Sequence, residues 1–288
     1  MVTSTKRTVK TILLSLTLLF GITAFAQETA YVNLSNNYTD DSIRVQLDKR
    51  PRFSAFKDNF GALGTTVGSK STKENSDAIF QLSIMQRLTN SNMIWNTNLF
   101  FQLTFTSYMD VLLPSYPIRD ISVNPGIGLA KDFIKDGKVI GKGYLMIEHE
   151  SNGFGEEGGF SRSWNKLSLA TTMQVTKNVE LQGKAWFPVI DGRHSQHLLR
   201  YQGVFFAGTT LSTNDKRLNF SAMVTPTYRK NLSANSKYEL NYRLSKKDPI
   251  FLILQYYNGY GENLLDYDLF KSRLRMGFSI KPDGFYIF

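Results

Sequence analysis

Apolar and polar side chains alternate at every second position along most of the chain after residue 76. In the segment NLFFQLTFT, from Asn98 to Thr106, the apolar row is Leu99, Phe101, Leu103 and Phe105, and the other row is mostly polar. A period of two places successive side chains on opposite faces of a strand. The segment therefore predicts a β-strand with one apolar and one polar face.

The same alternation recurs often enough to predict an all-β chain. Counting such segments along the chain gives about twelve candidate strands. They cover residues 53–64, 78–88, 95–109, 120–131, 140–152, 161–174, 177–188, 198–211, 216–228, 236–245, 249–258 and 270–281. An even number of strands is what a single-chain bacterial membrane barrel requires.

A soluble β-sandwich alternates in the same way, so the content of the two faces has to distinguish the two architectures. The chain has 21 Phe, 14 Tyr and 3 Trp, and large aromatic side chains lie on the apolar face of nearly every candidate strand. The sequence shows no helical periodicity, so we predict no layer of helices that would cover this apolar face. Because lipid requires every backbone group to be paired, a closed barrel satisfies the pattern best. We therefore predict a transmembrane antiparallel β-barrel formed by residues 51–288.

The amino terminus has the pattern of a secretory signal peptide. Lys6, Arg7 and Lys10 precede a mostly apolar run over residues 11–22, and Ala24-Phe25-Ala26 is a small-x-small cleavage pattern. An uncleaved anchor helix is the alternative, but the run is shorter than the roughly 20 residues that a spanning helix needs. We expect residues 1–26 to be removed and residues 27–50 to form an amino-terminal periplasmic segment outside the barrel wall.

Composition excludes several classes of site. There is no cysteine, so disulfides and thiolate metal sites are impossible. The 34 Lys and Arg side chains, three of them in the predicted leader, exceed the 24 Asp and Glu side chains. This excess suits an anionic membrane surface, but it is not gathered into a nucleic-acid patch. His194 and His197 fit a solvated loop better than a metal site.

One polar stretch interrupts the apolar alternation: EHESNGFGEEGGFSRSWN, residues 148–165. Strand parity puts His149 and Ser151 on the apolar, lipid-facing row of one strand and Asn165 on the apolar row of the next. Burial of polar side chains against lipid costs free energy unless they hydrogen-bond to one another or have a functional role. An imidazole can reach a hydroxyl two residues away, and an amide can fix its tautomer, which is the logic of an acyl-transfer site. The alternative is that these are rim residues that touch lipid headgroups.

The opposite face of the same strands predicts a filled lumen. Large side chains, among them Trp164 and Trp186, lie beside Glu148, Lys166 and Lys184 on the inward rows. For about twelve strands, such a face indicates a plugged, charge-paired interior rather than a wide channel. A catalytically inactive structural or pore-forming barrel is nevertheless the second functional interpretation.

Several blocks of the chain resemble the outer membrane phospholipase A family. HESNG at 149–153 followed by SRSWN at 161–165 is similar to the active-site signature of that family. Scattered blocks agree with it: FQLS at 80–83, PIRD…NP within 117–125, KAWF at 184–187 and YNGYGENLLDYD at 257–268. The resemblance implies a twelve-stranded outer-membrane barrel, active as a homodimer. It also implies Ca²⁺-dependent hydrolysis of phospholipid acyl esters at the sn-1 and sn-2 positions.

The resemblance also implies a role for individual residues. Ser151 matches the nucleophile, His149 the base and Asn165 the orienting amide. The backbone amide of Gly153 matches a donor to the oxyanion.

The calcium ligands follow from the resemblance in the same way. Ser161 matches a ligand in SRSWN, and Phe154 stands where the family has an arginine that binds through its main-chain carbonyl. Asp191 is the nearest candidate for the family's aspartate. Ser115 matches the serine that reaches the metal from the second copy of the dimer.

Two further departures from the family pattern bear on the metal site and on the dimer. Two extra residues place Glu156 and Glu157 near the site as possible further ligands. Phe105 stands where the family has a glutamine on its dimer-facing strand.

Overall fold

The computed structural model describes residues 39–155, 159–189, 197–229, 233–246, 248–281 and 284–286. The predicted signal peptide lies outside the described residues. The first element is helix α2 (Asp40–Asp48), where the Thr39 hydroxyl caps the amino terminus by accepting a hydrogen bond from the Ser42 amide. Two further short helices are η1 (Ile94–Asn96) and α3 (Leu198–Gln202). No helix in these ranges is long and apolar enough to cross a membrane.

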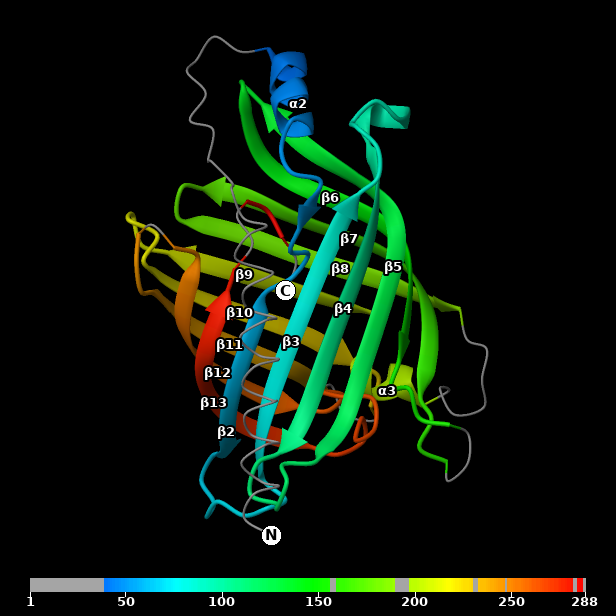
Figure 1. Ribbon diagram of the computed structural model, residues 1–288, viewed down its shortest axis with the longest axis vertical. Coiled ribbons are helices and arrows are strands. Elements are labelled where there is room, and N and C mark those ends of the chain that lie inside the picture. Colours follow the sequence, from blue (N-terminus) through cyan, green and yellow to red (C-terminus); the bar gives the residue numbers. More distant parts are fainter. Residues whose placement is uncertain are drawn as a thin grey trace, which may run out of the picture.

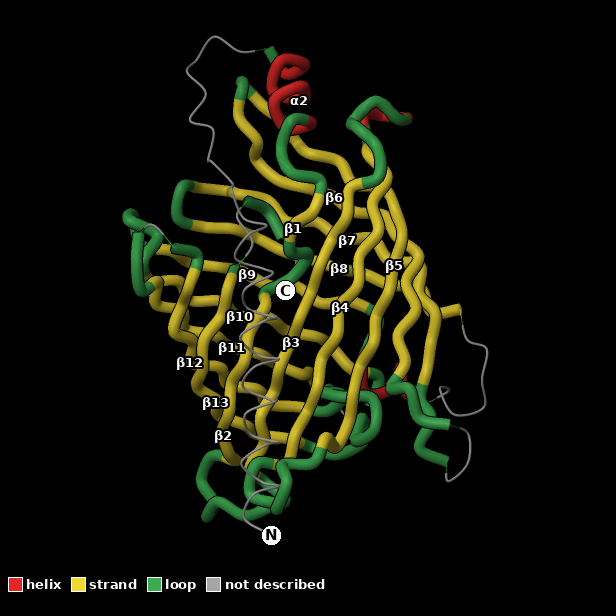
Figure 2. The backbone as a smooth tube through the Cα atoms, in the orientation of Figure 1, coloured by secondary structure: helices red, strands yellow, loops and turns green. Residues whose placement is uncertain are grey.

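Twelve antiparallel strands, β2 to β13, close into a barrel (Figures 1 and 2). Consecutive strands pair with each other, and β2 also pairs with β13, which closes the wall. The strands are β2 (Asn59–Thr66), β3 (Ser76–Arg87), β4 (Asn98–Asp110), β5 (Ile118–Lys135), β6 (Lys138–Ser151), β7 (Ser163–Thr176), β8 (Val179–Val189), β9 (Phe205–Ser212), β10 (Leu218–Thr227), β11 (Ser233–Arg243), β12 (Ile250–Gly259) and β13 (Lys271–Ile280). The predicted architecture is confirmed.

The wall has the two faces that the alternation predicts. On β6 and β7, the outward side chains include Ile147 and Leu169, each 63% exposed. The inward side chains of the same strands, such as Met146 and Ser168, are almost fully buried. An apolar exterior around a packed interior is the arrangement of a membrane barrel.

The two ends of the barrel differ in the length of their connections. At one end, where α3 lies, the connecting residues are 67–75, 111–117, 152–162, 190–204, 228–232 and 260–270. At the other end, where α2 lies, they include the short turns 136–137 and 177–178 (Figure 1). The polar stretch 148–165 therefore spans a long loop at the α3 end.

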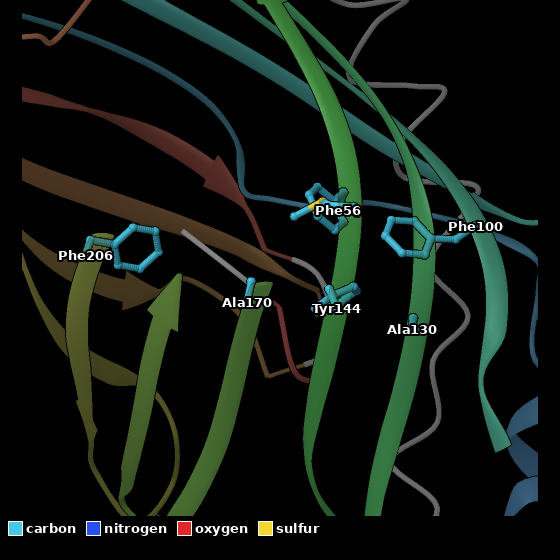
Figure 3. Packing of buried hydrophobic residues seen from close by; sticks show 7 residues of the cluster. Phe56, Phe100, Ala130, Tyr144, Ala170 and Phe206 are labelled. Carbon is cyan, nitrogen blue, oxygen red and sulfur yellow. The ribbon is translucent and has the colours of Figure 1, made fainter. Parts of the chain in front are cut away.

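An aromatic cluster fills part of the lumen. Phe56, which precedes β2, packs edge-on against Tyr144 of β6 with ring centroids 5.4 Å apart, and Phe100 of β4 packs against the same ring at 5.5 Å. Figure 3 shows Phe56, Phe100 and Tyr144 side by side. Each of the three is at most 3% exposed. Burial of three aromatic side chains contributes strongly to stability because each removes a large apolar area from water.

Ion pairs occupy further parts of the interior. Arg275 of β13 is fully buried and pairs with Asp77 of β3 at 2.6 Å and with Glu262 of the 260–270 loop at 2.5 Å. Lys281, just after β13, pairs with Asp58 and lies 3.7 Å from Glu239 of β11. The predicted charge-paired lumen is confirmed, and this filling does not favour a pore.

Several segments differ from the sequence prediction, among them the following three. The first candidate strand, 53–64, is divided: β1 (Phe53–Ser54) pairs briefly with β3, and the wall strand starts only at Asn59. The start of the 198–211 candidate is helix α3, because Leu198 is buried against Leu264 and Tyr267 at the mouth of the barrel. Within the predicted amino-terminal segment, α2 was not anticipated.

Candidate active site

The β6–β7 hairpin brings the candidate residues together through its register. His149 of β6 lies directly opposite Asn165 of β7, and Ser151 lies opposite Ser163. The outward rows continue through Ile147 and Leu167, both exposed. The predicted placement of His149, Ser151 and Asn165 on the outer face is confirmed.

His149 and Asn165 form a direct hydrogen bond across the two strands. The His149 carbonyl points toward β5, where it accepts a hydrogen bond from the Asn124 side chain at 2.7 Å. His149 and Asn165 are thus a non-hydrogen-bonded pair of the β6–β7 ladder, the kind whose side chains approach most closely. His149 Nδ1 lies 2.9 Å from Asn165 Oδ1. Because the amide oxygen only accepts, this contact places the ring proton on Nδ1 and leaves Nε2 as the basic nitrogen.

Ser151 ends β6 on the same outward row as His149. Two residues along a strand correspond to roughly 7 Å between backbone positions, which long side chains can span. The imidazole of His149 can therefore reach the Ser151 hydroxyl along the outer face of the wall.

Asn152 holds the beginning of the loop that follows. Its side chain donates to the Phe160 carbonyl at 2.8 Å and accepts from the Arg162 amide at 2.9 Å. Its own amide donates to the Arg162 carbonyl at 3.1 Å. These three bonds fix both arms of the loop, and Asn152 is only 4% exposed. The sequence reasoning missed this residue, although its place directly after Ser151 was a signal.

Gly153 follows with φ near +70°, in the left-handed region that glycine adopts at least cost. A side chain there would be strained by the backbone conformation, although nothing lies within 4 Å of the position of its Cβ. The glycine thus permits the sharp change of direction that turns the chain away from the wall directly after the Ser151 row.

The candidate calcium ligands are oxygen atoms of the loop. Phe154 is exposed, and Ser161 is half-buried. The carbonyl oxygens of Gly159 and Ser161 accept hydrogen bonds from the Arg162 guanidinium, so the Ser161 hydroxyl remains the polar atom of that residue best suited to a metal. A hydroxyl and a main-chain carbonyl are hard oxygen donors and fit Ca²⁺, which takes six to eight oxygens.

The other candidate ligands are not all placed. Asp191, Glu156 and Glu157 lie outside the described residues, as does His194. Ser115 lies in the 111–117 loop at the same end of the barrel, exposed and with φ near 69°. In the described part of the chain, no group of three His, Cys, Asp or Glu side chains forms a metal cluster.

The lumen side of the hairpin carries charges directly behind the candidate site. Glu150 accepts hydrogen bonds from Lys166 at 2.7 Å and from the Trp164 indole at 2.9 Å. Glu148 pairs with Lys184 of β8 at 2.5 Å. These inner contacts tie β6 to β7 and β8 where the outer face holds His149.

The hairpin and the barrel around it match known proteins. The family model described as phospholipase A1 matches residues 52–280. Phospholipase A1 of Proteus vulgaris is 25% identical over 166 residues, which are 57% of this chain and 54% of that protein. The Escherichia coli K12 relative is 26% identical over the same lengths. The chain thus spans about half the length of the curated relatives it matches.

Two solved structures have the same fold. The outer membrane phospholipase A of Escherichia coli has a TM-score of 0.68 and 22% identity, over 80% of this chain and 94% of that chain. A Salmonella typhi outer membrane phospholipase dimer with bound calcium has a TM-score of 0.70 and 21% identity, over 85% of this chain and 99% of that chain. With the apolar outer wall, this fold is that of a transmembrane β-barrel. The match of the family model over most of the barrel shows that the chain belongs to the phospholipase A1 family.

Proposed function

We propose that this chain is a calcium-dependent outer-membrane phospholipase that hydrolyses the sn-1 and sn-2 acyl esters of phospholipids. The observation that carries the proposal is the 2.9 Å contact between His149 Nδ1 and Asn165 Oδ1 on the lipid-facing side of the wall, in line with Ser151. Membership of the phospholipase A1 family supports the choice of substrate.

In the proposed reaction, the Ser151 oxygen attacks the ester carbonyl while His149 Nε2 takes its proton. Asn165 holds the imidazole in the required tautomer throughout. The ester bond then breaks, His149 returns the proton to the leaving lysophospholipid, and the acyl group stays on Ser151. Water hydrolyses this acyl-enzyme to release the fatty acid. The Gly153 amide would donate a hydrogen bond to the carbonyl oxygen as it gains charge.

Calcium would be held at the loop by the Phe154 carbonyl and the Ser161 hydroxyl, with Asp191 as a further candidate. When bound, the ion would supply positive charge next to the developing oxyanion. Ser115 would complete the coordination from a second copy of the chain, so the active form would be a homodimer. The Salmonella typhi relative, a dimer with bound calcium, supports this part of the proposal.

The outward position of the three side chains explains how substrate reaches them. A phospholipid in the bilayer would approach along the wall, without passing through the filled lumen. Long loops face the exterior in bacterial barrels and short turns face the periplasm. The site would therefore lie in the outer leaflet, with α2 and the amino-terminal segment on the periplasmic side.

Ser151→Ala provides the test, with Thr171→Val as the matched control. Thr171 is a hydroxyl residue of β7 in the same outward row as Asn165. With a fluorescent phospholipid in mixed micelles and Ca²⁺, we expect Ser151→Ala to lose about 10³-fold or more of the rate and the control to keep it. Chelation of Ca²⁺ should abolish wild-type hydrolysis. Undiminished hydrolysis by a folded Ser151→Ala barrel would end the proposal.

A further inference from the structure

The backbone ladder between β5 and β6 is interrupted beside His149. Val123 pairs with Ser151 and Gly126 pairs with Glu148, but the two positions between them on each strand form no pair. The residue of β5 that would face His149 is Pro125, which has no N–H to donate. Strand β6 therefore lacks regular backbone support on its β5 side at the residue that carries the imidazole.

A side chain from the lumen supplies the missing donor. Asn124 is 5% exposed, and its Nδ2 donates to the His149 carbonyl at 2.7 Å. A buried carbonyl without a partner costs free energy comparable to a lost hydrogen bond. The Asn124 amide thus supplies the hydrogen-bond donor to the His149 carbonyl that the backbone of Pro125 lacks.

A carboxylate spans the same interruption from the next residue. Glu150 lies between His149 and Ser151 in sequence, and its side chain points into the lumen. It accepts hydrogen bonds from Ser122 of β5 at 2.8 Å and from Trp164 and Lys166 of β7. One carboxylate therefore connects the three neighbouring strands behind the site.

We propose that Asn124 and Glu150 are positioning residues, which act through the wall on the His149–Asn165 pair. This inference rests on the proposed function. The gap would let the His149 segment of β6 move relative to β5, whereas the β6–β7 ladder is continuous there. A displacement of about 1 Å at reacting groups can cost about 10²-fold in rate. Asn124 holds the His149 carbonyl, and Glu150 holds the segment between His149 and Ser151, so the imidazole stays opposite Asn165.

Glu239 of β11 is the matched control residue. It is also a buried lumen carboxylate, 4% exposed, which accepts from Gln255 at 2.9 Å and pairs with Lys237 at 3.3 Å. The ladders of β11 with β10 and β12 are continuous at this position. Removal of its charge therefore disturbs the lumen without disturbing a ladder gap or the β6–β7 hairpin.

The test compares Glu150→Gln, Asn124→Ala and Glu239→Gln in the full-length folded barrel. Hydrolysis of a phospholipid in mixed micelles gives kcat and KM, and urea unfolding gives stability. The ¹⁵N shifts of the His149 ring report its tautomer independently of activity, and the chain has only three histidines to assign. We expect the first two variants to lower kcat by about 10- to 100-fold with KM unchanged. They should also change His149 from one tautomer, with the proton on Nδ1, to a mixture, whereas Glu239→Gln does neither.

Each outcome decides between positioning and a structural role. Full kcat and a single tautomer in both Glu150→Gln and Asn124→Ala would overturn the inference. A loss of activity that only follows the loss of folded protein, equally in Glu239→Gln, would also overturn it. If the wild-type barrel releases no fatty acid but its tautomer still responds to the two variants, positioning stands and the proposed function fails. If Glu150→Gln does not fold, Asn124→Ala decides, because it leaves every ion pair intact.

Discussion

The outer face of the β6–β7 hairpin carries the candidate active site, whereas its inner face carries ion pairs and hydrogen bonds that stabilise the barrel. The outer face is mostly apolar but carries Ser151, His149 and Asn165, and one hydrogen bond joins His149 to Asn165. The inner face holds Glu148 and Glu150 in a set of ion pairs and hydrogen bonds that reaches four strands. Strand periodicity makes this separation possible because adjacent residues point to opposite sides. Apart from the positioning residue Glu150, substitutions on the inner face should therefore change stability most, and substitutions on the outer face should change activity most.

Lys184→Met tests the inner face and should have the largest effect. Glu148 is 1% exposed, and its nearest cation is Lys184, while Lys166 lies 4.0 Å away. Removal of one partner of a buried ion pair costs about 3–5 kcal/mol, because the other charge remains buried. Urea unfolding in lipid vesicles should show this loss. The exposed Lys138→Met is the control, and equal unfolding free energies for the two variants would break the comparison.

Asn165→Ala tests the outer face. We expect a loss of about 10²-fold or more in kcat, because the imidazole loses the group that fixes its tautomer. The unfolding free energy should change by only about 0.5 kcal/mol, as for a substitution outside the packed lumen. Parallel measurements of phospholipid hydrolysis and urea unfolding check both values. A variant that keeps its activity but unfolds readily would reverse the assignment of the two faces.

Asp266→Asn sharpens the comparison at the barrel mouth, away from the hairpin, and should have the smallest effect. Burial alone would raise the pKa of Asp266, but hydrogen bonds and charge from Arg119 and Lys271 outweigh it and lower the pKa. A lowered pKa contributes stability above the unfolded value, near 4, which is lost as the pH falls through the folded pKa. The substitution should remove about 1 kcal/mol at pH 7.

The pH dependence provides the measurement for Asp266. As the pH is lowered below about 5, the unfolding free energy of the wild-type barrel should decrease. The decrease should be about equal to the difference in unfolding free energy between the wild type and Asp266→Asn at neutral pH. If the two proteins lose stability in parallel over this range, the ion pair with Arg119 contributes nothing.

Most of the wall could be predicted from sequence because a period of two is a local signal. Parity alone placed His149 and Asn165 on the outer face and Glu148 and Lys166 on the inner face. The candidate strand over 198–211 was wrong at its start, because α3 depends on the burial of Leu198 against a loop more than 60 residues later. Such a contact leaves no local pattern.

The support of the site could not be predicted for the same reason. Asn124 lies 25 residues before the carbonyl that it holds, and its role depends on the register that places Pro125 opposite His149. The pairing of Asp77 with Arg275 joins residues 198 positions apart. Periodicity gives the face of a residue, and only the closed barrel gives its partner.

Covalent labelling of the outer wall tests the central claim most directly. A lipid phosphonate that reacts with activated serines should label the folded barrel in vesicles, and mass spectrometry of its peptides should locate the adduct. We predict one adduct, on Ser151, which His149→Ala prevents although the barrel still folds. A barrel that hydrolyses phospholipid while the adduct forms on another residue, or forms equally in His149→Ala, would contradict the account.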